Sequence, residues 1–145
     1  MNDNGLNKTL RGIKQQFFAY RNGILAEQLR GTGSPCQVIF GLNVPQIAAI
    51  ARQLTPSAEL AEALWADKNV RESRLLACYL FPRDTTDSTR AEQLMLGVQT
   101  PEEGDMLCFR LLKHRPEARQ LVDKYAGSGN ALTAYTARSL ARHLE

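Results

Sequence analysis

Basic side chains recur near the ends of successive predicted helices, a placement that suits phosphate binding. In a stack of helices such groups line one surface and neutralise a polyanion backbone without reading its sequence. We therefore expect binding that weakens as salt rises. Solvated surface charge is the ordinary interpretation of each one alone, and Glu72, Glu102 and Glu103 lie among them. The candidate nucleic-acid-binding residues are Arg71, Arg74, Arg110, Lys113, Arg138 and Arg142.

Other familiar chemistries have little support. The glycines of residues 31–33 and 127–129 form G-x-G pairs without the third glycine of a dinucleotide-binding turn, and no GKS or GKT marks a P-loop. His114 and His143 follow predicted helix ends, with no nucleophile motif around them. Neither histidine stands at a recognised metal-ligand spacing from a cysteine. We expect no metal and no cofactor.

The composition is that of one ordinary globular domain, residues 1–145, with 43% hydrophobic residues and a net charge of +3. That charge is compatible with a polyanion partner but decides nothing alone. No apolar run is as long as a membrane span, and the N-terminal segment lacks the apolar core of a signal peptide. We expect a cytoplasmic protein with Cys36, Cys78 and Cys108 as buried, reduced thiols.

Capping signals and apolar periodicity predict helices along the whole chain and no sheet. Apolar residues recur at helical steps over residues 7–29, with a break at Gly23, and residues 30–35 form a loop. Further helices are expected to begin at caps or prolines and to number about seven or eight in all. Their predicted starts are Asn43 or nearby, Thr55-Pro56, Asn69 with Glu72 as an N-x-x-E cap, Thr100-Pro101, Arg115-Pro116 and about Asn130. One more helix is expected to follow a polar loop at residues 83–89.

A weak internal repeat supports a helical solenoid over a plain bundle. Asn69 and Glu72 recur as Thr100 and Glu103 at a displacement of 31 residues, and the Cys-aromatic pair at residues 78–79 recurs at a displacement of 30. A helical hairpin at this spacing is the unit of an α-solenoid. The predicted fold is all-α, a short HEAT-like or armadillo-like solenoid of antiparallel helix hairpins.

Several short motifs between residues 40 and 116 resemble the HEAT-like-repeat DNA alkylation repair glycosylases, the AlkD-like family. Phe40-Gly41 followed by Val44-Pro45 is similar to the family's aromatic-glycine turn before a helix. The more specific match is the order Leu64-Trp65, Glu72, Arg74 and Ala77. From the residues alone, Trp65 is predicted to lie in the core, and Glu72 is explained by a helix cap.

The resemblance implies a catalytic role for Asp105. By position it is similar to the family carboxylate that favours departure of a cationic alkylated purine, stabilising the oxocarbenium-like transition state without a cofactor. Four residues earlier, where the family carries tryptophan, this chain has Pro101. The family also uses an aromatic residue and an arginine from repeats beyond this aspartate. In this chain the possible counterparts of that arginine are Arg138 and Arg142. The alternative role for Asp105 is to complement the helix dipole near an N-terminus.

The leading hypothesis is therefore a DNA-binding protein of this family that binds duplex DNA. Either it is catalytically weakened, or it is active and Asp105 assists the departure of cationic alkylated purines. The alternative, from a different functional class, is a non-catalytic helical-repeat scaffold that binds another protein. A continuous basic groove leading to Asp105 would favour DNA, whereas an apolar or acidic groove would favour a protein. A third alternative is a short solenoid that forms a homodimer to complete its core.

Overall fold

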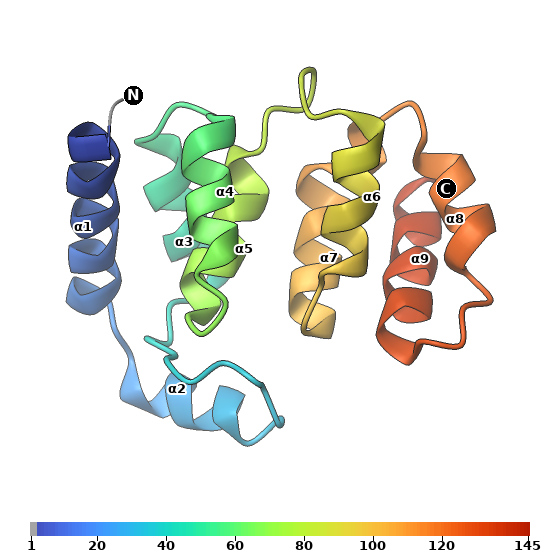
Figure 1. Ribbon diagram of the computed structural model, residues 1–145. Helices are drawn as coiled ribbons and strands as arrows, with labels where there is room; N and C mark the ends of the chain where they lie inside the picture. Colours follow the sequence, from blue (N-terminus) through green and yellow to red (C-terminus); the bar gives the residue numbers. More distant parts are fainter. Residues whose placement is uncertain (1–2) are drawn as a thin grey trace. The chain divides into compact units, whose positions relative to one another are not determined.

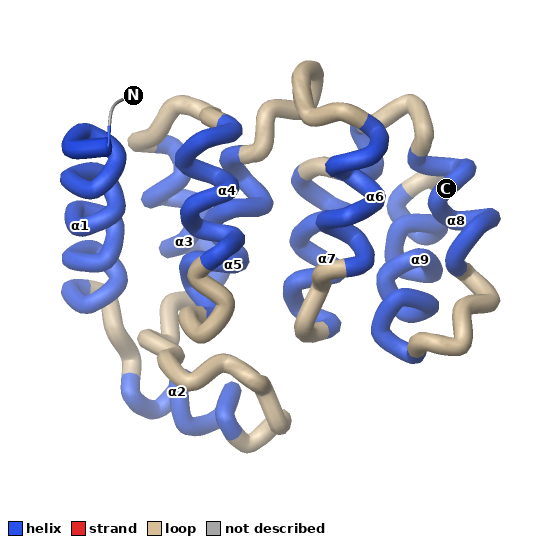
Figure 2. Tube along the Cα trace, viewed as in Figure 1, coloured by secondary structure: helices blue, strands red, loops and turns tan. Residues whose placement is uncertain are grey.

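The computed structural model describes residues 3–145, so the first two residues of the predicted domain lie outside the described part. Within that part the chain forms nine α-helices and one short 3₁₀-helix (Figures 1 and 2). The only β-pairing among these residues is an isolated bridge between Val38 and Val70. The prediction of an all-α protein is confirmed. The chain divides into two compact units, residues 1–81 and 82–145.

The first unit holds five helices, joined by short turns and one longer loop between α2 and α3. The predicted break near Gly23 is present, because α1 and α2 are separate helices. Apolar side chains from α1, α3, α4 and α5 form the core; Phe17, Ile47, Leu64 and Leu75 are all at most 1% exposed. The helices are α1 (Asp3–Ala19), α2 (Gly23–Arg30), α3 (Val44–Arg52), α4 (Ala58–Ala66) and α5 (Arg71–Leu80).

The second unit packs α9 against α7 and α8, with a 3₁₀ turn after α7. Leu94, Leu107 and Leu140 are fully buried within it. All three cysteines of the chain are buried, as predicted. Its helices are α6 (Ser88–Leu96), α7 (Pro101–Arg110), η1 (Leu112–His114), α8 (Ala118–Tyr125) and α9 (Ala131–His143).

Helices α5 and α7 explain the internal repeat seen in the sequence. Each has ten residues, and each boundary of α7 lies 30 positions after that of α5. Cys78 and Cys108 therefore occupy the same position within the two helices. Such repetition of a buried helix is consistent with a helical repeat. The displacement of 31 between Asn69 and Thr100 joins residues that are not equivalent, since the N-caps are Val70 and Thr100.

The helix caps agree with the sequence where the capping contacts are local. Asn43 closes a full capping box on α3 with Gln46, and the Thr100 hydroxyl accepts a hydrogen bond from the backbone N–H of Glu103. The N-cap of α4 is Ser57, so the prediction of a cap at Thr55 was wrong by two residues. Similarly, α8 begins at Ala118, after the turn that contains Pro116.

The predicted cap between Asn69 and Glu72 was wrong. No side chain caps α5, and the Glu72 side chain is fully buried. Its carboxylate instead accepts hydrogen bonds from the backbone N–H groups of residues 40–42, at 3.0, 3.0 and 3.3 Å. The Arg71 guanidinium lies 2.6 Å from the same carboxylate and also donates to the backbone carbonyl of Leu42. A buried anion fixes the turn before α3, because its oxygens satisfy three otherwise unpaired donors.

Gly41 is required at this turn. Its φ of +86° is a conformation that side chains rarely adopt, and a Cβ there would lie 2.2 Å from the backbone oxygen of Asn22. The backbone carbonyl of the neighbouring Phe40 accepts a hydrogen bond from the Asn22 N–H at 2.8 Å. Phe40-Gly41 and Glu72, which carry part of the family resemblance, thus belong to one structural contact.

Candidate functional site

Asp105 lies in the second turn of α7, half-buried, with its carboxylate directed at α9. Oδ2 accepts a hydrogen bond from the Tyr135 hydroxyl at 2.8 Å, and Oδ1 accepts one from the Ser139 hydroxyl at 2.7 Å. The Tyr135 hydroxyl is also 3.1 Å from Oδ1. Both donors come from one face of α9, four residues apart. The carboxylate is therefore held in a fixed orientation by two hydroxyl groups.

Close packing of α7 on α9 makes these hydrogen bonds possible. A Cβ on Gly104 would lie only 2.6 Å from the Thr136 hydroxyl oxygen, so glycine permits this approach. The Cys108 thiol donates to the Thr136 carbonyl oxygen at 3.4 Å, one turn further along α7. Burial raises the pKa of the Cys108 thiol to about 12, which leaves it a neutral packing group.

The hydroxyl of Tyr135 is coupled to both an anion and a cation. Its hydrogen bond to Asp105 is the main cause that raises its pKa above the ordinary value of 10.0, followed by partial burial. The positive charge of the Arg142 guanidinium, on the turn of α9 that follows Ser139, acts on this pKa in the opposite direction. The structure thus brings together Asp105 and one of its predicted arginine partners, Arg142, through Tyr135.

Pro101 occupies the first turn of α7 and is exposed. It therefore gives Asp105 no aromatic neighbour on that side. One turn after Asp105, on the same face of the helix, Phe109 is 47% exposed. The Lys113 ammonium lies 4.2 Å from the centre of its ring, and the His143 ring lies 5.9 Å away, edge-on. An accessible aromatic ring among basic groups thus stands beside the carboxylate.

Basic groups gather where α7 passes into η1. The Arg83 guanidinium donates to the backbone carbonyl of Arg110 at 2.9 Å, and that of Arg115 donates to the carbonyl of Arg83. Burial, followed by the charges of Arg83, Lys113 and Arg110, lowers the pKa of His114 below 6.5. That these positive charges lower the pKa of His114 indicates a positive electrostatic potential around it, which a bound anion would reduce.

The other predicted basic residues fall into two groups. Arg138 and Arg142 are exposed on α9. Arg71 and Arg74, by contrast, are 6% and 1% exposed. The Arg74 guanidinium stacks on the Trp65 ring at 3.5 Å and donates to the Trp65 backbone carbonyl at 2.8 Å. Both arginines are enclosed in the first unit, where they bind groups of the protein itself. Trp65 is buried, as predicted.

Tyr135, Ser139, Phe109 and Arg83 were not identified from the sequence. Tyr135 stands 30 residues after Asp105, the displacement that relates α5 to α7, but no local motif marks it. Phe109 falls within an apolar helical face, where packing is the ordinary interpretation of an aromatic residue. In the part of the chain that the structure describes, no group of three or more histidine, cysteine, aspartate or glutamate side chains could hold a metal ion.

No helix among the described residues is long and apolar enough to cross a membrane. Over residues 13–143 the chain matches the family model described as DNA alkylation repair enzyme. No curated protein and no solved structure gives a match to the chain.

Proposed function

Because the chain belongs to the DNA alkylation repair enzyme family, we propose that it binds duplex DNA through the surface of α7, η1 and α9 and releases cationic alkylated purines. The observation that carries this proposal is the Asp105 carboxylate, held by Tyr135 and Ser139 with Arg142 nearby. The proposal includes a cytoplasmic location. It leaves Arg71 and Arg74 out of the interface, since both are buried.

The chemistry needs no metal or cofactor. An N3- or N7-alkylated purine is already cationic, so heterolysis of its bond to C1′ sends the electron pair to the base, which leaves neutral. The sugar becomes an oxocarbenium ion, which a fixed carboxylate stabilises electrostatically. Water then adds to C1′ and loses a proton, which leaves an abasic site. Asp105 suits the first step because both hydroxyl donors restrict its rotation and leave no reorganisation for the transition state.

Phe109 supplies a surface on which a base can stack. Cationic bases are attracted to the face of an aromatic ring, and the same ring already lies beside the Lys113 ammonium. Arg110, Lys113, Arg138 and Arg142 are the proposed phosphate contacts. Each such contact contributes to a salt-dependent affinity that is independent of sequence.

The decisive experiment measures release of N7-methylguanine from a duplex by wild-type protein and by Asp105→Asn. We expect the variant to lose at least about 100-fold in rate, the usual loss when one electrostatic stabiliser is removed. Asp123→Asn is the matched control, because Asp123 is exposed on α8. Equal rates for wild type and Asp105→Asn would overturn the catalytic role of Asp105.

Binding is tested separately, by titration with duplex DNA with and without an abasic-site analogue at low and moderate salt. Salt-sensitive binding that prefers the analogue supports repair. Binding without base release would indicate a DNA-binding protein that has lost catalysis. Absence of binding at low salt would overturn the proposal and favour the protein-binding scaffold.

His114 provides a readout of phosphate binding that does not depend on catalysis. Its pKa is lowered by burial and then by the neighbouring cations Arg83, Lys113 and Arg110. A bound phosphate would offset those charges, so duplex DNA should raise the pKa of His114 toward or above 6.5. The measurement is an NMR titration of the imidazole with and without a duplex. An unchanged pKa at saturating DNA would exclude this surface from the interface.

A further inference from the structure

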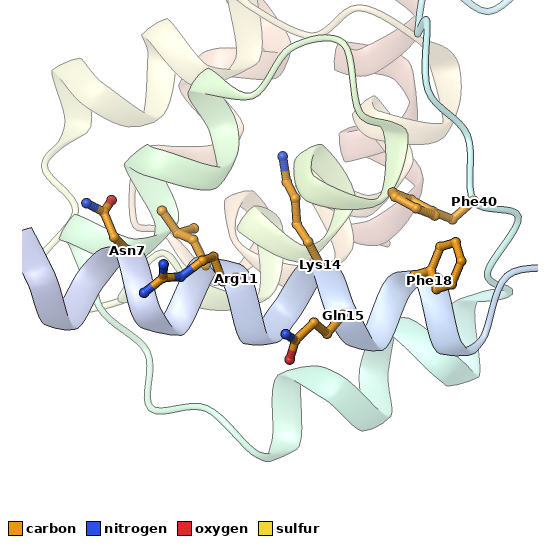
Figure 3. Close-up of a pocket in the computed structure, with 7 residues that line it drawn as sticks. Asn7, Arg11, Lys14, Gln15, Phe18 and Phe40 are labelled. Carbon is orange, nitrogen blue, oxygen red and sulfur yellow. The ribbon is translucent and has the colours of Figure 1, made fainter.

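An open groove of about 820 Å³ runs along α1 in the first unit, whereas Asp105 belongs to the second. Figure 3 shows Phe18 and Phe40 near one end, with Arg11 and Asn7 further along the helix and Lys14 between them. From Asn7 to Phe18 the groove follows roughly 16 Å of helix, at about 1.5 Å per residue. Its lining includes two aromatic rings, two cationic groups and two amides, and no carboxylate.

The excess positive charge of the whole chain lies in its first 22 residues. This segment contains four basic residues and one acidic residue, Asp3, which gives +3, equal to the net charge of all 145 residues. Residues 23–145 therefore carry no net charge. The basic residues are Lys8, Arg11, Lys14 and Arg21. The first three follow one another at steps of three residues, which makes an evenly spaced row on one helix.

The aromatic end of the groove is accessible, and the ring of Phe18 there contacts the guanidinium of Arg21 from the same chain. Phe18 is 57% exposed, and the Arg21 guanidinium lies 3.8 Å from the centre of its ring. Phe40 is fixed by Phe17, with ring centres 5.7 Å apart, and by the hydrogen bond from its N–H to Glu72. Of the two rings, Phe18 and Phe40, the ring of Phe40 is therefore held in place, since its neighbour Phe17 is fully buried.

Lys14 is positioned by the fold. Its ammonium lies 2.8 Å from Asp67, which also accepts a hydrogen bond from the Ser73 hydroxyl. This ion pair partly neutralises Lys14. Most of the attraction for an anion would then come from the exposed Lys8, Arg11 and Arg21.

We propose that this groove binds a single-stranded segment of nucleic acid, with a base stacked at Phe18 and Phe40 and its phosphates on Arg11 and its basic neighbours. Base stacking on aromatic rings beside a row of cations is the usual basis of sequence-tolerant single-strand binding. Asn7 and Gln15 offer donors and acceptors to base edges. An evenly spaced row of cations matches a polymer with regular charges better than an acidic peptide, whose charges depend on its sequence.

The test uses fluorescence anisotropy with the full chain and two labelled probes of equal length, a single strand of about 12 nucleotides, within the usual site sizes, and the same backbone without bases. Phe18→Ala should weaken binding of the normal strand about 5- to 100-fold and leave the baseless strand unaffected. Arg11→Gln should weaken both and reduce the slope of log affinity against log salt by about 0.7. Tyr20→Ala is the matched control, since Tyr20 is 50% exposed but does not line the groove.

The outcomes separate this inference from the proposed function. Phe18→Ala should leave the rate of base release from a duplex unchanged, whereas Phe109→Ala should lower that rate. Circular dichroism of each variant checks folding. Equal single-strand affinity for wild type, Phe18→Ala and Arg11→Gln would overturn the proposal. A peptide of alternating glutamate and phenylalanine that displaces the strand at lower concentration than unlabelled strand would also overturn it and identify a protein-binding groove.

Discussion

Glu72 has no exposed surface, and its charge is retained because four donors surround it: three backbone N–H groups and the Arg71 guanidinium. A buried carboxylate without such partners would take up a proton and become neutral, or would destabilise the fold around it. Glu72→Gln removes the negative charge and replaces one acceptor oxygen by an amide NH₂, which cannot accept a hydrogen bond from the donors around it. We expect a loss of about 3 kcal/mol in the free energy of unfolding, measured by urea denaturation.

An exposed glutamate provides the control for this prediction. Glu27 pairs with Arg30 at 3.3 Å on the surface of α2, so Glu27→Gln should change the unfolding free energy by less than about 0.5 kcal/mol. A similar small loss for Glu72→Gln would mean that the turn at residues 40–42 does not depend on the carboxylate.

Tyr135 gives a pH dependence whose sign follows from its hydrogen bond. Asp105 and then partial burial raise the pKa of Tyr135 above 10.0, so the folded protein favours the neutral phenol. The stability that this contact supplies is present below pH 10 and is lost as the pH rises through the folded-state pKa. Tyr135→Phe should therefore be less stable than wild type at about pH 8, and the difference should shrink above about pH 10. Urea unfolding across this range measures it; a constant difference would contradict the hydrogen bond.

The contacts that sequence reasoning did not identify share one physical property. Glu72 has partners about 30 residues away, and so has Asp105, whose donors come from α9. A spacing of three residues made a local cap at Asn69 attractive, but the backbone donors of residues 40–42 bind the carboxylate instead. Contacts between distant segments leave no periodicity to detect, so Tyr135 and Ser139 could not be identified before the helices were packed.

At the scale of helices, local chemistry predicted the starts of α3, α7 and α9. Asn43, Thr100 and Asn130 each accept a backbone N–H within three residues, so the signal and the contact lie in the same turn. The start of α4 shows the limit of this reasoning. The residue types allow a helix to begin at either Thr55-Pro56 or Ser57. In the structure Ser57 is the N-cap, and its backbone N–H also donates a hydrogen bond to the Leu80 carbonyl at 3.0 Å.

The contact between α7 and α9 allows a prediction that links packing to the candidate site. Gly104→Ala would bring a Cβ to within 2.6 Å of the Thr136 hydroxyl, so α9 must shift or the threonine must change rotamer. Overpacking of this kind costs about 1–3 kcal/mol. Because Tyr135 and Ser139 lie on either side of Thr136, we also expect slower base release. Thermal unfolding and the N7-methylguanine assay measure both effects.

A glycine in open space is the comparison for this substitution. A methyl group added at Gly129 would meet nothing within 4 Å beyond its neighbours in the chain, so Gly129→Ala should leave both stability and rate near those of wild type. Loss of stability in Gly104→Ala with an unchanged rate would show that the orientation of Asp105 tolerates movement of α9.

For the whole molecule, the position of charge matters more than its sum. The first unit has nine basic and six acidic residues, and the second has nine of each, so the net +3 belongs entirely to residues 1–81. At about 0.1 M salt, charges are screened beyond about 10 Å. A net charge of +3 therefore cannot attract DNA to the whole surface, and local clusters must supply the affinity.

Two double variants with the same net charge separate these effects. Lys8→Glu with Arg11→Glu and Arg52→Glu with Arg119→Glu each change the chain from +3 to −1, because each reversal removes two charges. All four side chains are exposed. We expect the first variant to elute from a heparin column at clearly lower salt than the second, since its substitutions lie in the row on α1. Equal elution would mean that heparin responds to net charge alone, and the row of basic residues on α1 would then have no special part in binding polyanions.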